Sequence, residues 1–471
     1  MLEEVRLTAR DKALRINIDG SRHGTFAEIG GGQEVARWFF HVGGAAGTVA
    51  KTMSAYDMAV SDAIYGPCAR YVSRQRLHSM LDHEWGLLLK RLSAKRGDST
   101  RFFVFADTVA TRSFTRSEDG RGWLGIRFQV QPRDEPSEIL IHARMWDRDN
   151  AHQQEALGLL GVNLCYGACF LSHDPIRLIG SLMDELTRDR MEVDTIKFSG
   201  PAFAGVDNRL MSLQLVHQRL TNAAVFTADG EVVEPAEVLH QKPVLIERGS
   251  FRPITNVTLD MIDGALAEMR EEPELAEGEP VVLMEMTLRH LLATGTTIDF
   301  ADYLARVDTL SALGRMVMIS NYSRFHNVAM YLRRYTRNLV GMVLGVPTLE
   351  KICDERFYSD LEGGVLEALG RLFRGRVKLY LYPWKNRETG EVVTADNFRI
   401  GAGYEHLYAH LRENRFVHPI RRYRAQELSV FPADVLEAIQ SGDGTWEKMV
   451  PAPIVPLIKQ KGFFGYPKAG G

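Results

Sequence analysis

Between residues 209 and 385, short apolar runs alternate with stretches of helical periodicity. Two of these runs, residues 281–284 and 316–319, are apolar at every position. A strand that is apolar on both faces has to be covered on both faces, as in parallel sheets that are flanked by crossover helices. Repeated strand–helix units therefore predict an α/β region with a mainly parallel sheet.

The alternation predicts individual elements. We expect strands at 223–227, 243–247, 281–286, 316–320, 339–344 and 377–382. We expect helices at 209–220, 256–270, 299–313, 325–337 and 348–373. The strands from 243 to 344 are each followed by a predicted helix that can cross back over the sheet, which is the connection that successive parallel strands require.

The chain outside 209–385 has different patterns. Residues 1–208 carry strand and helix signals without regular alternation, so we predict an α+β N-terminal region. After 385 the chain is more polar, with short helical pieces at 404–413 and 433–440 and an extended piece at 451–456, so we predict a mostly helical C-terminal extension. Three parts, at 1–208, 209–385 and 386–471, suit a chain of 471 residues at about 150 residues per domain.

Composition excludes several classes of protein. The chain has 57 basic and 60 acidic residues and a net charge of −3, which favours neither nucleic acid nor an anionic membrane. Four cysteines are too few for a disulfide framework. The longest uncharged apolar run, 156–171, is shorter than the ~20 residues of a membrane span and predicts a buried helix. Because the first residues lack a signal-peptide pattern, we expect a cytoplasmic protein without membrane or nucleic-acid partners.

The strand and loop at 243–256 form the strongest candidate site. A strand, a glycine-containing turn and a helix start make an anion site, because free N–H groups and the helix dipole both favour negative charge. Gly249 allows close backbone approach, Arg248 and Arg252 carry charges for phosphate or carboxylate, and either Thr255 or Asn256 can cap the helix. We therefore predict that Gly249, Ser250, Arg252 and Thr255 hold an anionic small-molecule ligand.

The same segment resembles a known family. Residues 249–256, Gly-Ser-Phe-Arg-Pro-Ile-Thr-Asn, are similar to the Gly-Ser-Phe-Asn-Pro-Ile-Thr-Asn signature of nicotinate and nicotinamide mononucleotide adenylyltransferases. Residues 319–324 resemble a downstream Ile-Ser-x-Thr-x-Ile-Arg signature of that family. The chain departs from the family at Thr258, where the family has histidine, and at Arg252, where it has asparagine. The whole chain is also similar to a widespread bacterial family that is commonly assigned this activity.

The resemblance implies an activity and cofactors. It implies a nucleotidyltransferase that binds ATP phosphates with the turn, requires Mg²⁺ with the ATP, and relies on positioning and charge neutralisation for catalysis. The match covers between 8 and 14 of 471 residues. No general base stands out in the sequence, so the catalytic residues stay unassigned.

Four further residues are candidate ligands. Lys51 belongs to a segment, 28–57, that is rich in glycine and hydroxyl groups, and tight packing is the alternative. Lys197 lies near the end of a predicted strand, where loop capping is the alternative. Asn321 and Arg324 follow the predicted strand 316–320, where a capped helix is the alternative. Sequence order leaves open whether these segments and the turn line one cleft.

The sequence contains only weak signals for a metal site. His406 and His410 share a helical face, but a solvated face is the simpler interpretation, so we expect no structural metal.

We expect an enzyme that acts on a phosphorylated or nucleotide-like small molecule. The alternative is a non-catalytic, self-assembling scaffold, in which the small residues of 156–171 serve packing. We also expect a homo-oligomer.

Overall fold

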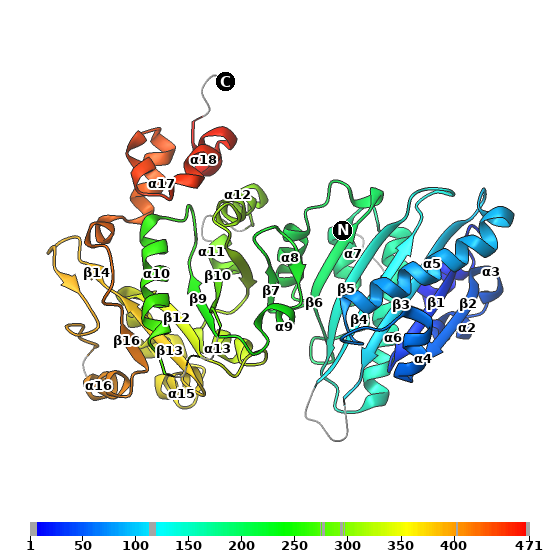
Figure 1. Ribbon diagram of the computed structural model, residues 1–471, viewed down its shortest axis with the longest axis horizontal. Coiled ribbons are helices and arrows are strands. Elements are labelled where there is room, and N and C mark those ends of the chain that lie inside the picture. Colours follow the sequence, from blue (N-terminus) through cyan, green and yellow to red (C-terminus); the bar gives the residue numbers. More distant parts are fainter. Residues whose placement is uncertain are drawn as a thin grey trace. The chain divides into compact units, whose positions relative to one another are not determined.

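The computed structural model describes residues 7–112, 119–273, 275, 278–292, 295, 297–401 and 404–467. The chain divides into two compact units, residues 1–224 and 225–471 (Figure 1). The first division therefore falls after residue 224, where the sequence predicted it after 208. Residues 386–471, which were predicted as a separate part, belong to the second unit. The predicted α/β class with mainly parallel strand pairing in the second unit is confirmed.

The first unit contains a six-stranded sheet in the order β2-β1-β3-β4-β5-β6. Strands β2, β1 and β3 are parallel, whereas β3 to β6 run antiparallel to one another. The strands are β1 (Arg22–Gly30), β2 (Val49–Ala55), β3 (Arg101–Ala110), β4 (Gly120–Phe128), β5 (Ser137–Met145) and β6 (Met191–Ser199). The mixture of pairings is the α+β character that the sequence predicted.

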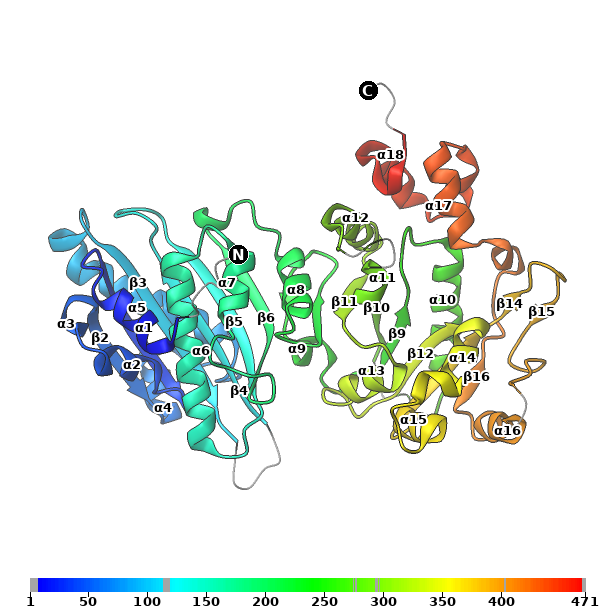
Figure 2. The same ribbon diagram turned by 180° about the vertical axis from the view of Figure 1, so that it is seen from behind.

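Helices cover both faces of this sheet. The long helix α5 lies on one face (Figure 1), and α6 lies on the other (Figure 2), with α1, α2 and α7 packed beside α6. The helices are α1 (Ala9–Asn17), α2 (Val35–His41), α3 (Ala45–Thr48), α4 (Met58–Tyr65), α5 (Arg74–Arg96), α6 (Asn150–Phe170), α7 (Pro175–Ser181) and α8 (Asn208–His217), with a 3₁₀ turn η1 (Pro201–Phe203).

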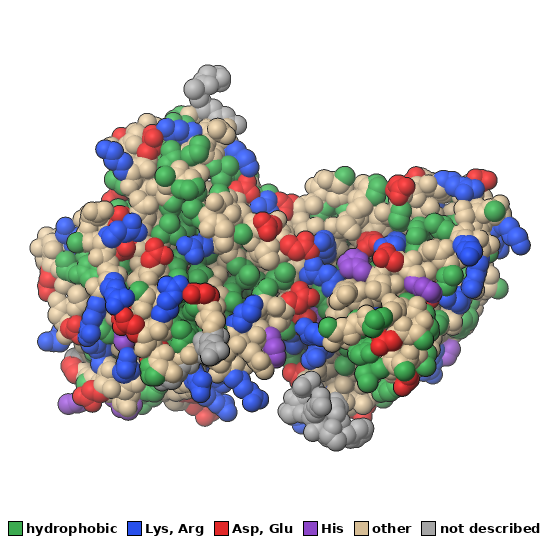
Figure 3. Space-filling view, in the orientation of Figure 1, with side chains coloured by type: hydrophobic (Ala, Val, Ile, Leu, Met, Phe, Trp, Pro, Cys, Tyr) green, Lys and Arg blue, Asp and Glu red, His purple; other side chains and the backbone are tan. Residues whose placement is uncertain are grey.

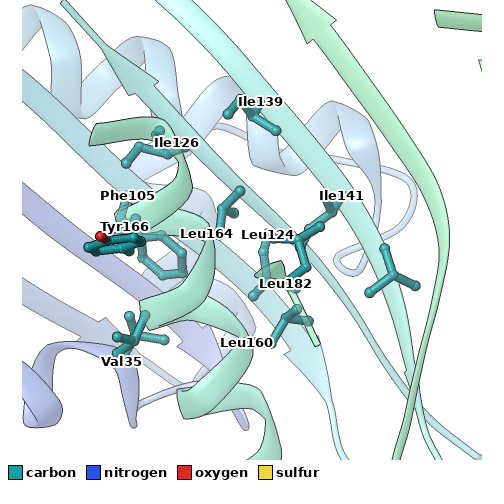
Figure 4. Packing of buried hydrophobic residues seen from close by; sticks show 14 of the residues in the cluster. Val35, Phe105, Leu124, Ile126, Ile139, Ile141, Leu160, Leu164, Tyr166 and Leu182 are labelled. Atoms are coloured by element: carbon teal, nitrogen blue, oxygen red, sulfur yellow. The ribbon is translucent and has the colours of Figure 1, made fainter. Parts of the chain in front are cut away.

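The apolar run 156–171 forms most of α6 and is a core helix, as predicted. Leu160 and Leu164 of α6 face Ile126 and Ile141 of the sheet (Figure 4), and all four side chains are fully buried. Small residues let α6 approach its neighbours closely, since a Cβ at Gly161 would lie 2.3 Å from a methyl carbon of Val35. Within the described residues, no helix is both long and apolar enough to cross a membrane.

The second unit contains an eight-stranded sheet in the order β16-β13-β12-β9-β10-β11-β7-β8. The strands are β7 (Ala223–Phe226), β8 (Val232–Val233), β9 (Val244–Arg248), β10 (Val281–Thr287), β11 (Met316–Ser320), β12 (Val340–Gly345), β13 (Val377–Tyr382) and β16 (Val417–Pro419). Six neighbouring strands, β11, β10, β9, β12, β13 and β16, are parallel to one another. Numbered in chain order from β9, they read 3-2-1-4-5-6, the strand order of dinucleotide-binding α/β folds.

Helices connect these strands as the alternation predicted. They are α9 (Pro235–Leu239), α10 (Asn256–Arg270), α11 (Leu288–Leu291), α12 (Phe300–Ser311), α13 (Phe325–Leu332), α14 (Val346–Ile352), η2 (Glu355–Tyr358) and α15 (Gly364–Leu372). The predicted helix 348–373 is therefore wrong as a single helix, because a 3₁₀ turn and a loop separate α14 from α15. Helix α10 packs against β9, β12 and β13.

The C-terminal part adds short elements to the second unit. They are the hairpin β14 (Trp384–Lys385) and β15 (Val392–Val393), α16 (Glu405–Glu413), η3 (Ala425–Ser429), α17 (Pro432–Ser441), η4 (Gly444–Lys448), η5 (Ala452–Ile454), α18 (Val455–Lys461) and η6 (Phe463–Gly465). The extended piece predicted at 451–456 is wrong, because proline is also favoured in the first turn of a helix, and η5 and α18 begin there. Strand β16 completes the sheet edge.

Candidate functional site

A cavity of about 390 Å³ lies at the carboxyl ends of strands β9, β10 and β11, beside helix α14. Ligands of open α/β sheets bind at this edge, and the volume falls within the range of small-molecule sites. Five basic side chains line it: Arg248, Arg289, His290, Arg324 and Lys351. Four aromatic side chains line it as well: Tyr322, Phe325, Phe357 and Tyr358. Among the residues that the structure describes, no Asp or Glu lines the cavity.

Arg248 is held in place by a buried carboxylate. Its Nε and Nη2 donate to the two oxygens of Glu285, each at 2.8 Å, and both side chains are buried. The Ser320 hydroxyl donates to the same carboxylate at 2.5 Å, so β9, β10 and β11 are joined at their ends. The guanidinium also lies 4.5 Å from the centre of the Phe325 ring. Arg248 is therefore rigid, and Glu285 balances its charge.

Arg324 has a different kind of partner. Its Nη1 donates to Oδ2 of Asp360 at 3.1 Å, and its Nη2 contacts the other carboxylate oxygen. These hydrogen bonds raise the pKa of Arg324 and lower the pKa of Asp360. The guanidinium lies 5.4 Å from the centre of the Tyr358 ring. The Asp360 side chain is 64% exposed, so this ion pair faces solvent.

The other basic residues supply the net charge of the cavity. Within the described part of the chain, neither Arg289 nor Lys351 has a carboxylate partner within ion-pair distance. Burial lowers the pKa of His290, and the nearby Arg248 charge acts in the same direction, so the neutral imidazole is favoured. With Arg248 and Arg324 balanced, Arg289 and Lys351 leave two uncompensated positive charges at the cavity.

The predicted turn lies beside the cavity, bound by its own chain. The Gly249 N–H donates to the Glu285 carbonyl at 3.1 Å, and the Ser250 carbonyl accepts from Arg306 at 3.0 Å. The Arg252 guanidinium pairs with Asp302 of α12 at 2.6 Å. A ligand phosphate at Arg252 would therefore have to replace a carboxylate.

The start of α10 is also covered from within the chain. Thr255 is fully buried and makes no capping hydrogen bond to the helix. The Asn256 N–H donates to the Met449 carbonyl at 2.9 Å, and the Asn256 side chain donates to the Lys448 carbonyl at 2.9 Å. These carbonyls occupy part of the positive end of the helix, where the sequence predicted a ligand anion.

The remaining predicted residues fall into two groups. Asn321 and Arg324 line the cavity of the second unit, together with Arg248 from the end of β9. Lys51 and Lys197 lie in β2 and β6 of the first unit, and Lys51 pairs with Glu84 of α5. The structure therefore brings together the ends of the segments 248–256 and 320–326, while 28–57 and 194–209 belong to the other sheet.

The glycine- and hydroxyl-rich segment of the first unit opens on a cavity of its own. Its volume is about 550 Å³, at the carboxyl ends of β1, β2 and β3. Gly31, Tyr56, Asp57, Thr108 and Arg112 are among its lining residues. The segment therefore lies beside a cavity, but Lys51, the residue selected from it, does not line that cavity.

Two buried carboxyl groups lie next to these strand ends. Glu28 and Asp107 are opposite each other in the register of β1 and β3. Glu28 accepts the N–H groups of Val35 and Ala36, yet burial raises its pKa to about 7. Burial, and the charge of Glu28, also raise the pKa of Asp107, whose side chain has no exposed surface. A Cβ at Gly32 would lie 2.2 Å from an Asp107 oxygen, so the backbone closes over the pair.

Metal chemistry and charge patches add little to this picture. Searched over the described residues, the structure holds no group of three or more His, Cys, Asp or Glu side chains arranged to bind a metal ion. The thiols of Cys165 and Cys169 are buried, and burial raises the pKa of both. On the face shown in Figure 3, basic and acidic side chains are interspersed.

Several lining residues were selected from the sequence, among them Arg248, Asn321 and Arg324, and others were missed. Arg289 and His290 directly follow β10, and Lys351 lies in α14 after β12. These positions obey the same strand-end rule that selected Asn321 and Arg324. The signal was therefore present in the sequence, without a glycine-rich turn or a family signature to mark it.

Comparisons with known proteins give little further evidence. No protein-family model and no curated protein matches the chain. Among solved structures, it is similar to the competence/damage-inducible protein CihA from Agrobacterium tumefaciens, with 18% identity, 33% of this chain and 88% of that chain covered, and a TM-score of 0.24. A CinA superfamily protein from Enterobacter cloacae has 14% identity, 36% and 96% coverage, and a TM-score of 0.26. TM-scores this low support no inference about this chain.

Proposed function

We propose that the second unit binds a phosphorylated, nucleotide-like small molecule in the cavity beside Arg248, and that the protein is an enzyme acting on it. The observation that carries this proposal is the cavity itself. It lies at the carboxyl edge of a sheet with the order 3-2-1-4-5-6, and basic and aromatic side chains line it without a carboxylate among its described lining residues.

The charge of the cavity suits a phosphate monoester. Arg289 and Lys351 provide two positive charges without carboxylate partners among the described residues, and a phosphate monoester carries about −1.5 to −2 at neutral pH. Arg324 adds a planar guanidinium, which binds phosphate through two parallel hydrogen bonds. The phosphate end of the ligand is therefore assigned to these three side chains.

The aromatic lining suits the other end of a nucleotide. Phe357 lines the cavity with a side chain that is 42% exposed, although a ring of this size is usually buried. Aromatic faces stack on nucleic-acid bases at roughly 1–3 kcal/mol per base. Phe357 and Tyr322 are therefore the side chains on which a nucleobase or pyridine ring would stack, in a cavity that basic groups also line.

The finer proposal is nucleotidyl transfer of the nicotinate mononucleotide adenylyltransferase type. The signature at 249–256 supports it, because the turn follows the first strand of the parallel series and lies directly after Arg248. The reaction joins a mononucleotide phosphate to the α-phosphate of ATP and releases pyrophosphate. Because the described lining holds no carboxylate, Mg²⁺ would be held mainly by substrate phosphates and water.

Binding is tested first, with the full-length protein. Isothermal titration with AMP and nicotinate mononucleotide should give affinities that fall by about tenfold or more in Arg289→Ala and in Lys351→Ala, since each loses a charge-assisted phosphate contact. The matched control is Arg337→Ala, an exposed arginine three residues before β12 at the opposite edge of the same sheet. Equal losses in all three variants, or no binding by the native protein, would contradict the proposal.

Turnover is tested separately. The adenylyltransferase proposal predicts ATP-dependent pyrophosphate release with at least one member of a mononucleotide panel. Absence of release with every member would exclude that reaction while leaving the binding result intact. Native mass spectrometry addresses the scaffold alternative, because a copurifying small anion favours the enzyme and a large ligand-free assembly favours the scaffold.

A further inference from the structure

We propose that Asp360 is an internal competitor for the ligand's phosphate at Arg324 and so determines which anions the cavity accepts. This inference rests on the proposed function, because it concerns the same cavity. Asp360 lies in the loop between η2 and α15, thirty-six residues after Arg324. It is not a lining residue of the cavity, but it engages the guanidinium that is.

The contact between these two side chains has the geometry of a bound phosphate. Each carboxylate oxygen of Asp360 meets a different Nη atom of Arg324. Two oxygens of a phosphate monoester bind a guanidinium through the same pair of parallel hydrogen bonds. Arg324 is held over the Tyr358 ring and its side chain is 23% exposed, so the fork is already oriented when a ligand arrives. Asp360 therefore accepts the pair of hydrogen bonds from Arg324 that a phosphate would accept.

The second arginine of the cavity shows why Asp360 is displaceable. Glu285, the partner of Arg248, is 1% exposed, and it also accepts a hydrogen bond from Ser320. Removing that carboxylate would leave a buried charge without a partner, which is costly. Asp360 has no such constraint, because its carboxylate returns to water when it leaves Arg324. Arg248 thus keeps its carboxylate partner, whereas Arg324 can exchange its carboxylate partner for a ligand phosphate.

The energetics favour exchange with a ligand. An exposed ion pair contributes little to stability, whereas a hydrogen bond from a charged group to a bound ligand contributes more. A phosphate that is also held by Arg289 and Lys351 therefore displaces Asp360 readily. After displacement the carboxylate stays close to the ligand, so its repulsion grows with the ligand's charge. Asp360 accordingly favours a monophosphate over a triphosphate.

The test compares two conservative substitutions in the full-length protein. Asp360→Asn keeps the size of the side chain and removes its charge. Asp354→Asn is the matched control, because Asp354 lies six residues earlier and pairs with the exposed Arg356 outside the cavity lining. Titrations with inorganic phosphate, AMP and ATP should show about 2- to 5-fold tighter binding in Asp360→Asn, with the largest gain for ATP, and no change in Asp354→Asn.

A double-mutant cycle makes the result specific to Arg324. The gain from Asp360→Asn should be smaller when Arg324→Ala is present, because the competitor then has no target and only its repulsion of the ligand remains. Unchanged or weaker binding in Asp360→Asn would overturn this inference, as would an equal gain in Asp354→Asn or a gain of undiminished size in Arg324→Ala. Binding of none of the probes to any variant would overturn the proposed function and this inference together.

Discussion

Glu247 gives the sharpest prediction about the sheet that carries the cavity. It lies in β9, directly before Arg248, and its side chain is 6% exposed. Burial raises its pKa to about 8, and the Arg315 charge opposes that rise. The folded protein therefore holds a proton on Glu247 that the unfolded chain, with a pKa of 4.5, releases between pH 4.5 and about 8. Because the unfolded state binds fewer protons in that window, the free energy of unfolding falls as the pH rises through it.

The decrease in the free energy of unfolding can be calculated from the pKa of Glu247 in the folded and in the unfolded protein. At 1.36 kcal/mol per pH unit, a rise from 4.5 to about 8 costs roughly 5 kcal/mol at high pH, of which roughly 4 kcal/mol falls between pH 5 and pH 9. Glu247→Gln keeps the shape of the side chain and removes the titration. The difference in the free energy of unfolding between Glu247→Gln and the native protein should therefore shift in favour of the variant by roughly 4 kcal/mol from pH 5 to pH 9.

Urea unfolding at pH 5 and pH 9 measures this difference. Hydrogen exchange of the peptide that covers β9 assigns the change to the second unit, and intrinsic exchange rates cancel between variants at one pH. Titrations of other groups also cancel, since both proteins share them. Parallel pH dependences for Glu247→Gln and the native protein would refute the reasoning, because they would show that Glu247 is ionised in the folded state.

Two further predictions concern packing and buried charge. Gly161→Ala should destabilise the first unit by about 1–3 kcal/mol, because the new Cβ would lie 2.3 Å from Val35. Gly86→Ala on α5 should stabilise the unit by about 0.5–1 kcal/mol, because its Cβ would meet nothing within 4 Å. Urea unfolding of both variants measures these opposite changes. Glu272→Ala should cost about 3–5 kcal/mol, because it leaves the mostly buried Lys378 ammonium without its main partner, and a small change in the melting temperature would contradict this.

The parallel sheet was predictable because its signal is local. Residues 316–320 and 377–382 form β11 and β13 at the predicted bounds, since apolar runs covered on both faces have sharp ends. Residues 256–270 form α10 at the predicted bounds as well. Strand β2 (Val49–Ala55) was missed because it is an edge strand whose residues alternate between half-buried and exposed. Its small and polar residues become a strand only through pairing with β1, which sequence periodicity does not report.

The site shows a different limit. The strand-end rule depends only on where strands stop, so it selected Asn321 and Arg324, and applied to β10 it would also have selected Arg289 and His290. The strand–turn–helix pattern at 243–256 predicted that Arg252 carries a charge for a ligand anion, but that charge is balanced by Asp302, fifty residues further along. The charge that a ligand meets depends on neighbours in space. A short motif therefore leads to the edge of the sheet where the candidate cavity lies, while the cations that lack carboxylate partners among the described residues have to be found from the ion pairs.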